Sequence, residues 1–238
     1  MSSANPSLIF CALDTPDLNQ ATAWAKQIGP VTGALKLGME FVNAFGPQGI
    51  EAVQKAAPDA ALFIDLKFHD IPNTVAGAVR ATCNNFAPAY LNVHAAGGVE
   101  MMQAAKEACG TGTKLLAVTI LTSLDQESIR MVGYQHELSD QVTRMAKLTQ
   151  DSGLDGVVCS ALEIEQIRTL CGPSFELMVP GIRPAGAQTQ DQKRVMTPEQ
   201  ALSAGATHLV IGRPITGAAD PAAAAQDILD TITKDKAA

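Results

Sequence analysis

Eight short apolar runs, rich in leucine, valine and isoleucine, recur along the chain with helical stretches between them. Strands that are apolar on both faces are typical of a parallel sheet covered by helices. A regular alternation of strand and helix then predicts a (β/α)8 barrel of the TIM type, in the α/β class. The predicted strands are Leu8–Leu13, Gly33–Leu37, Ala61–Leu66, Tyr90–Val93, Leu115–Leu121, Gly156–Cys159, Glu176–Val179 and His208–Ile211.

The length and composition agree with this fold. A chain of 238 residues with 47% hydrophobic and 17% charged residues is long and apolar enough to bury a large core. It contains no low-complexity segment or shift in composition that would mark a linker. We therefore expect residues 1–238 to form a single domain.

The net charge of -7 and the lack of basic runs argue against a nucleic-acid-binding protein. No apolar stretch approaches the roughly 20 residues needed to cross a bilayer, and the segment Met1 to Pro6 is short and polar. The five cysteines form no CxxC pair, and Cys11 and Cys159 fall in apolar runs, so we expect small buried side chains. These features predict a cytoplasmic protein with no membrane partner.

Capping residues stand where helices should follow the strands. Thr15-Pro16 and Asp220-Pro221 place a capping side chain before a proline of the first turn. Ser160 with Glu163, and Thr197 with Gln200, have the spacing of a capping box. We expect helices to begin at these four positions.

Ionisable residues gather at the ends of the predicted strands, where a barrel of this kind builds its active site. Side chains alternate along a strand, so Asp65 and Lys67 should share one face while Leu66 points to the other. By the same alternation Lys36 should point inward. Other polar residues follow strand ends as well, namely Asp14, His94, Arg183 and Arg213.

Two lysines and two aspartates, Lys36, Asp65, Lys67 and Asp70, sum to zero formal charge. Such a balanced set can stay ionised in a partly desolvated pocket, whereas an unpaired buried charge is costly. The same set could instead be an ordinary ion-pair network that closes the barrel. Asp70 lies beyond the strand, so it could reach back to the site or across to a second subunit. None of the histidines has the spacing of a metal site, and we predict no metal.

The residues after the last two strands predict a phosphate site. Gly212 allows close approach of a backbone amide, and Arg213 offers a planar set of donors. The segment of about residues 180–196 is rich in Gly, Pro and polar residues and is too long for a simple turn. We interpret it as a loop that closes on phosphate through Arg183 and Gln192.

Taken together, the sequence resembles the bacterial orotidine 5'-phosphate decarboxylase family over nearly its whole length. The resemblance rests on six sequence blocks, of which the block from Asp65 to Thr74 is the most specific. The blocks are Ala12-Leu13-Asp14, Leu35-Lys36-Leu37-Gly38, Asp65-Leu66-Lys67-Phe68-His69-Asp70-Ile71-Pro72-Asn73-Thr74, Thr119-Ile120-Leu121-Thr122-Ser123, Pro180-Gly181-Ile182-Arg183-Pro184 and Ile211-Gly212-Arg213-Pro214-Ile215.

The resemblance implies a cofactor-free decarboxylation of orotidine monophosphate to uridine monophosphate in a homodimer. Lys67 would donate a proton to C6 of the pyrimidine, Asp65 would lie beside the departing carboxylate, and Lys36 and Asp70 would hold the array, with Asp70 supplied by the neighbouring subunit. The implied substrate-binding residues are Asp14, Lys36, Asp65, Thr74, Thr122, Ser123, Arg183, Gln192, Gly212 and Arg213.

Two alternatives remain open. Sugar-phosphate decarboxylases and aldolases of the same barrel suprafamily share the D-x-K-x-x-D string but use magnesium, held by a carboxylate at the end of strand two. This chain has Lys36 there, and a lysine repels a hard cation. The second alternative is a non-catalytic barrel that senses nucleotides through Gly212 and Arg213. It would have no need of the balanced lysine and aspartate array.

Overall fold

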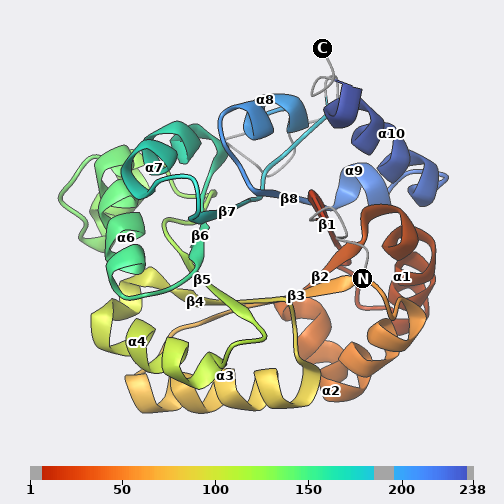
Figure 1. Cartoon of the computed structure of the whole chain (residues 1–238), viewed down its shortest axis with the longest axis horizontal. Helices are drawn as coiled ribbons and strands as arrows, with labels where there is room; N and C mark the ends of the chain where they lie inside the picture. Colours follow the sequence, from red (N-terminus) through yellow and green to blue (C-terminus); the bar gives the residue numbers. More distant parts are fainter. Residues whose placement is uncertain (1–6, 185–195, 235–238) are drawn as a thin grey trace.

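A computed structural model describes residues 7–184 and 196–234 and shows a closed barrel of parallel strands. The strands pair in sequence order, and β8 pairs with β1 to complete the cylinder. Figure 1 shows the strands as an inner ring with the helices outside it. The strands are β1 (Ile9–Ala12), β2 (Ala34–Gly38), β3 (Ala61–Phe68), β4 (Tyr90–His94), β5 (Lys114–Val118), β6 (Gly156–Val158), β7 (Glu176–Val179) and β8 (His208–Ile211).

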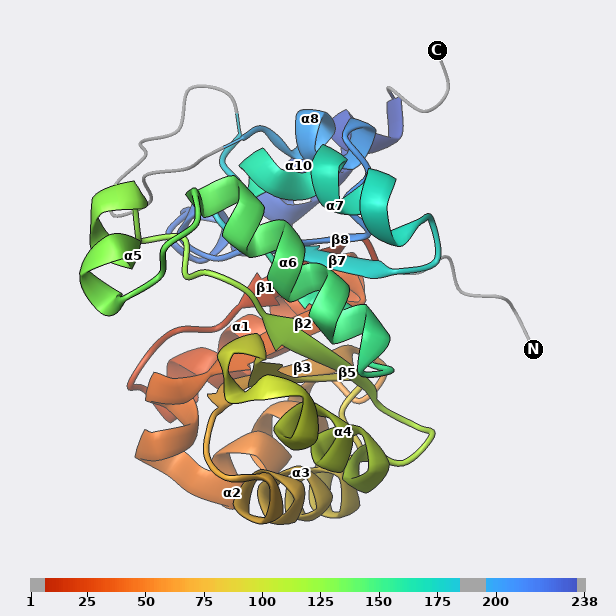
Figure 2. The ribbon, with the colours of Figure 1, turned by 90° about the vertical axis from the view of Figure 1, so that its left-hand side faces the viewer.

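Helices connect successive strands, as the predicted (β/α)8 fold requires. Two of them, α3 and α4, lie side by side along one flank of the barrel (Figure 2). The helices are α1 (Leu18–Thr32), α2 (Met39–Ala56), α3 (Pro72–Phe86), α4 (Gly98–Cys109), α5 (Gln126–Val132), α6 (Leu138–Asp151), α7 (Ile164–Cys171), α8 (Pro198–Ser203), α9 (Arg213–Thr216) and α10 (Pro221–Lys234), with 3-10 turns η1 (Ala95–Gly97) and η2 (Ala161–Glu163).

The buried apolar side chains form two layers separated by the strand backbones. The larger layer fills the space between the strands and the helices and includes Leu35, Leu37 and Ile64. The smaller one fills the inside of the barrel and includes Phe10 and Phe63. Because both faces of each strand are covered, the strands are apolar on both sides, which is the pattern that predicted the barrel.

All eight predicted strands are present, with small differences at their ends. The prediction for the fifth strand was wrong at its end, since β5 stops at Val118 rather than Leu121. From Thr119 the chain leaves the sheet and leads toward α5. By contrast, β3 is longer than predicted and continues to Phe68, two residues beyond its predicted end. These differences matter because both strand ends contribute to the site described below.

The helix-start predictions were half right. Asp220 caps α10 by accepting a hydrogen bond from the amide of Ala223, and Thr197 forms a complete capping box with Gln200 at the start of α8. The prediction at Thr15-Pro16 was wrong, because Asp17 caps α1 and the Thr15 hydroxyl accepts from the amide of Asp17 instead. Ser160 caps only the turn η2, so α7 begins later, at Ile164.

Other features of the fold agree with the sequence. Cys11 and Cys159 are buried, and the five cysteines are free thiols. Among the described residues, no helix is both long and apolar enough to cross a membrane.

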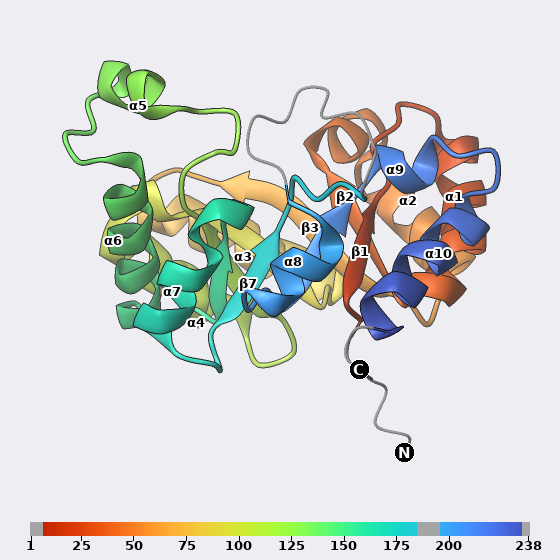
Figure 3. The same ribbon diagram turned by 90° about the horizontal axis from the view of Figure 1, so that it is seen from above.

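Figure 3 shows that α5 stands clear of the strands, at the same end of the molecule as α9. Since α5 and α9 follow strands β5 and β8, this end is the mouth of the barrel, where the carboxyl ends of the strands meet.

Candidate active site

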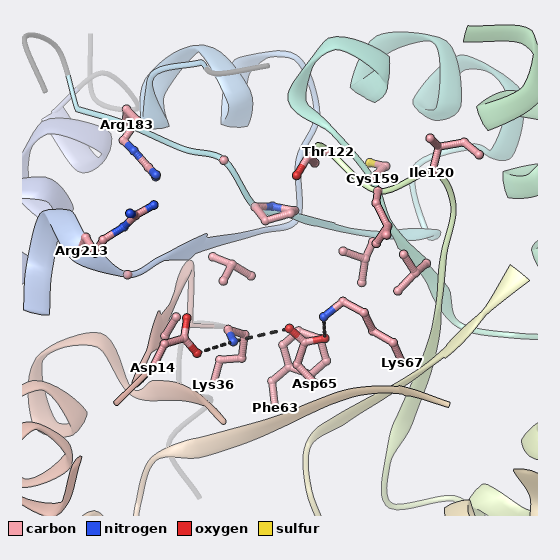
Figure 4. A pocket seen from close by; sticks show the side chains of 18 of the residues that line it. Asp14, Lys36, Phe63, Asp65, Lys67, Ile120, Thr122, Cys159, Arg183 and Arg213 are labelled. Carbon is pink, nitrogen blue, oxygen red and sulfur yellow. Dashed lines mark hydrogen bonds and ion pairs between the residues drawn. The ribbon is translucent and has the colours of Figure 1, made fainter. Parts of the chain in front are cut away.

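A pocket of about 510 Å³ opens at the mouth of the barrel. Its lining comes from the ends of the strands other than β4 and from the segments that follow them, which is where barrels of this type place their catalytic groups. Figure 4 shows a row of charged side chains along the floor of the pocket, two arginines on one wall and apolar side chains on the other. The lining residues are Ala12, Asp14, Lys36, Phe63, Asp65, Lys67, Val118, Ile120, Leu121, Thr122, Val158, Cys159, Pro180, Gly181, Arg183, Val210, Gly212, Arg213 and Thr216.

Four charged side chains form a row of alternating sign across the floor of the pocket. The Nζ atom of Lys36 lies 3.1 Å from Oδ1 of Asp14 and 3.5 Å from Oδ2 of Asp65. On the other side of Asp65, its Oδ1 lies 2.6 Å from Nζ of Lys67. The row therefore reads Asp14, Lys36, Asp65, Lys67 and sums to zero formal charge (Figure 4).

The members of the row stabilise one another's charge. Burial acts to lower the pKa of Lys36, but the carboxylates of Asp65 and Asp14 outweigh it, so the net pKa lies above its ordinary value. Burial acts to raise the pKa of Asp65, but Lys36 and Lys67 outweigh it and the net pKa is lowered. Both groups are thus held in their ionised forms in a pocket that would disfavour either one alone.

The backbone at the end of β3 differs from a regular strand. Register between β3 and β4 shifts between Ile64 and Phe68, and Lys67 has a φ of 52°. A left-handed conformation costs a residue with a side chain about 1 kcal/mol. Simple alternation is therefore not what brings Lys67 to Asp65. The predicted pairing is present, but an irregular strand end produces it.

The predicted site residues that follow β3 and β5 do not all reach this pocket. Of the residues that the structure describes, Asp70, Thr74 and Ser123 are exposed and do not line it. The carboxylate of Asp70 accepts a hydrogen bond from the amide of Ile71 at 2.7 Å. Within one chain, Asp14 rather than Asp70 completes the balanced set, and the expected contribution of Asp70 to a neighbouring subunit stays a prediction.

Two arginines face the pocket from the side of β7 and β8. Arg183 is 9% exposed and donates from its guanidinium to the carbonyl of Ile182, and Arg213 begins α9. Figure 4 shows both guanidinium groups directed into the same part of the pocket, away from the lysines. Gly212 lines the pocket between them and Ala12. Gln192, predicted to join this group, lies outside the described residues.

The opposite wall is apolar and was not predicted. Val118 and Val158 line the pocket from the ends of β5 and β6, and Ile120 follows β5. Figure 4 shows Ile120, Cys159 and Thr122 on the side of the pocket away from the charged row. A second residue missed from the sequence is Asn92, which is fully buried on β4 and bonds to both Asp65 and Lys67. An asparagine in an apolar run is the signal that could have found it.

Among the described residues, no group of three or more His, Cys, Asp or Glu side chains is arranged to hold a metal ion. His94 stacks on His69 with ring centroids 5.4 Å apart, and burial, together with the nearby His69 and Lys67, lowers the pKa of His94. Neither histidine lines the pocket. The charged groups that line the pocket are ammonium, carboxylate and guanidinium groups.

The closed barrel with ionised side chains at its mouth defines a (β/α)8-barrel enzyme. The chain belongs to the orotidine 5'-phosphate decarboxylase / HUMPS family, whose family model matches residues 7–228. It is an enzyme of the carboxy-lyase class.

Close relatives and solved structures agree with this assignment. The chain is 47% identical over 235 residues to orotidine 5'-phosphate decarboxylase of Trichlorobacter lovleyi, covering 96% of both chains. It is 49% identical to the enzyme of the same name from Moorella thermoacetica, covering 92% of this chain and 90% of that one. The crystal structure of orotidine 5'-phosphate decarboxylase from Lactobacillus acidophilus superimposes with a TM-score of 0.83 at 34% identity, covering 96% of this chain and 99% of that one.

Proposed function

We propose that the protein converts orotidine monophosphate to uridine monophosphate and CO2 without a cofactor, in the cytoplasm, as a step of pyrimidine biosynthesis. The observation that carries the proposal is the position of Lys67. Its ammonium group lies 2.6 Å from Asp65 on the floor of the pocket, below an apolar wall and across from two arginines. Names of close relatives and the family match support the same substrate.

The row of charges suits the chemistry of this reaction. When the bond between C6 and the carboxylate breaks, the electron pair stays on C6, and no adjacent carbonyl group can spread it. A fixed ammonium group stabilises that charge and can then deliver a proton to form the C6–H bond, after which Lys67 regains its proton from solvent. Asp65 and Lys36 keep the donor charged and aimed, because the array is built before the substrate arrives.

The apolar wall gives the leaving group a place to go. CO2 is uncharged and has no need of hydrogen-bond donors, so Val118, Ile120 and Val158 are suitable neighbours for it. In the substrate the same carboxylate would lie near Asp65, a like charge. We assign Asp65 to the place beside the departing carboxylate.

The arginine side of the pocket fits the 5'-phosphate. Arg183 and Arg213 supply guanidinium groups that bind phosphate through paired hydrogen bonds, and phosphate sites near β7 and β8 are frequent in this fold. The distance between this side and Lys67 lets binding of the phosphate orient the ring without touching the reacting bond. We assign Thr122 to the pyrimidine, Asp14 to the ribose, and Gln192 with the 180–196 loop to closure over the phosphate.

We further propose that the active protein is a homodimer in which Asp70 acts in the partner's pocket. Asp70, Thr74 and the 66% exposed Ile71 lie on the surface just beyond β3. An exposed carboxylate beyond the end of a strand is placed to reach a second copy of the chain. In the same arrangement Ser123 and Thr74 would reach substrate only when the dimer and its loops are closed.

The experiment that tests the function is turnover of orotidine monophosphate by the purified protein, followed by the loss of its ultraviolet absorbance. We expect turnover to continue in EDTA, because the Lys36 ammonium lies 3.5 Å from Asp65, where the magnesium-dependent relatives need a carboxylate. Activity on keto-gulonate phosphate, abolished by EDTA, would support the magnesium-dependent alternative. Tight binding of the nucleotide with no turnover would support the nucleotide sensor.

A further inference from the structure

We infer that Asn92 is a positioning residue for decarboxylation, which fixes both the backbone and the charge partner of Lys67. This inference rests on the proposed role of Lys67 as proton donor. The evidence is a pair of hydrogen bonds from one buried side chain. Asn92 Oδ1 accepts from the backbone amide of Lys67 at 2.8 Å, and Asn92 Nδ2 donates to Oδ1 of Asp65, also at 2.8 Å.

The first hydrogen bond replaces a missing part of the sheet. Ile64 pairs with Leu91, and the next pair is Phe68 with Val93, so three residues of β3 face the single residue Asn92 of β4. Two of those three residues therefore have no counterpart on β4, and their amides lose the regular hydrogen bonds between the strands. The Asn92 side chain takes the place of a strand carbonyl and accepts from one of these amides, that of Lys67.

That amide belongs to a residue in an unfavourable conformation. Lys67 has a φ of 52°, a region that side-chain-bearing residues avoid unless the surroundings hold them there. Without the hydrogen bond that the Lys67 amide donates to Asn92, the segment from Asp65 to Phe68 can relax toward an extended strand. Its lysine would then point elsewhere, although the barrel itself would stay closed.

The second hydrogen bond fixes the counter-charge. Asp65 Oδ1 receives both the Asn92 amide and the Lys67 ammonium, while Oδ2 faces Lys36 at 3.5 Å. The carboxylate is thereby held from three directions and cannot rotate to pair with only one lysine. Because the Lys67 amide can only donate and the Asp65 carboxylate accepts, the orientation of the Asn92 amide group is determined by its partners.

Burial makes this arrangement specific to asparagine. Asn92 is fully buried, so no water is available to replace either hydrogen bond, and a residue of another shape or polarity would leave at least one partner unsatisfied. Leucine has nearly the same size and can form neither bond. Aspartate has the same shape, and when protonated it can form both, donating from its O–H to Asp65 and accepting from Lys67.

The test compares Asn92→Leu and Asn92→Asp with a matched control, Thr149→Val. Thr149 is also fully buried and polar, but it bonds to the carbonyl of Met145 on α6, outside the barrel. We expect Asn92→Leu to lower kcat about 100-fold, the loss associated with misplacing a catalytic group by roughly 1 Å, with KM changed less than about threefold. Thr149→Val should leave both constants near those of the unmodified protein.

The pH profile gives a readout that a purely structural role would not produce. In Asn92→Asp the ionised new carboxylate repels Asp65, whereas its protonated form restores the two bonds. Asp65, Lys67 and Lys36 are the charged groups around it, and His94 lies two residues further along β4. We therefore expect the loss of kcat in Asn92→Asp to shrink as pH falls. Asn92→Leu should show no such recovery.

The outcomes separate the inference from the proposed function. A dead Lys67→Ala variant together with a normal kcat in Asn92→Leu would overturn the inference alone, whereas full activity of Lys67→Ala would overturn the proton donor and the inference with it. If Asn92→Leu does not fold, the profile of Asn92→Asp decides. A loss of kcat in Asn92→Asp that does not shrink as pH falls, or no loss beyond that of Thr149→Val, would overturn the inference.

Discussion

The two ends of the barrel both hold lysine and carboxylate side chains, but among the described residues those at the mouth face a pocket and those at the opposite end pack against aromatic rings. At the mouth, Lys36 and Lys67 lie on either side of Asp65 beneath open volume. At the opposite end, Lys114 and His208 contact Glu176, and the Tyr90 hydroxyl lies 2.8 Å from Nε2 of His208. The rings of Tyr90 and His208 pack edge-on against Phe10, which fills the barrel interior.

The difference lies in what surrounds the charges. At the closed end, His208 also bonds to the carbonyl of Ser7, and aromatic rings occupy the space that a ligand would need. There Glu176 pairs with Lys114 and contacts His208, and together with Tyr90 these residues join the starts of four strands. At the mouth the same kinds of groups are arranged in a row with one face left toward the pocket. Charge pairing thus stabilises the fold at one end and prepares a site at the other.

The largest effect should come from removing the charge nearest the reacting carbon. Lys67→Ala should lower kcat for orotidine monophosphate by at least about 1,000-fold, since both proton donation and charge stabilisation are lost. The fold should remain, because Asp65 keeps its contact with Lys36. Steady-state kinetics would measure the loss of kcat, and binding of uridine monophosphate would show that the fold remains. Near-normal turnover would show that the mouth is no more catalytic than the closed end.

Mixing inactive variants tests whether the mouth of one chain is a complete site. If Asp70 serves the partner's pocket, Lys67→Ala and Asp70→Ala subunits should together recover about a quarter of the unmodified activity, since half of the dimers are mixed and each has one intact site. Lys36→Ala mixed with Lys67→Ala is the matched control. Both lysines lie in one chain's pocket, so this pair should recover nothing.

No recovery in the first mixture, after subunit exchange has been demonstrated, would mean that each pocket is complete within its own chain. In that case the exposed position of Asp70 would have to change on substrate binding.

Some features of the two barrel ends could be predicted from the sequence and others could not, and the reason is physical. The strands and the inward positions of Lys36 and Asp65 follow from alternation along regular β-structure, which local sequence determines. The bulge that places Lys67 depends on pairing with β4, so neither it nor Asn92 was foreseen. The closed-end network was missed too, because Tyr90, Glu176 and His208 stand at the starts of separate strands.

The arginine side of the mouth should show a smaller effect, confined to binding. Arg213→Ala should raise KM for orotidine monophosphate about 10- to 100-fold, the size of one or two charge-assisted hydrogen bonds to phosphate. The slower reaction of the nucleoside without phosphate should be unchanged. Arg144→Ala, an exposed arginine on α6, is the control. An equal loss with both substrates would move Arg213 out of the phosphate site.

The smallest effect on activity is expected at the closed end, where the readout is acid stability. Burial acts to raise the pKa of Glu176, but hydrogen bonds with His208 and Lys114 outweigh it and lower the pKa from 4.5 to about 2. Because the pKa of Glu176 is lower in the folded state than in the unfolded state, the ionised carboxylate stabilises the fold at any pH above the unfolded-state pKa. This contribution is lost as pH falls from about 4.5 toward 2. Glu176→Gln cannot titrate, so its stability should fall less steeply across that window.

At neutral pH, Glu176→Gln should cost about 1 to 2 kcal/mol, because the partner Lys114 is half exposed and solvent screens part of the loss. Turnover should stay within about twofold, since no atom of this network lines the pocket. Urea unfolding between pH 2 and 7 measures the slope. Glu137→Gln, which removes an exposed pair with Arg130, should leave that slope unchanged. If both variants lose stability alike, the closed-end charges contribute no more than a surface ion pair does. The two ends of the barrel would then differ only in how exposed their charged side chains are.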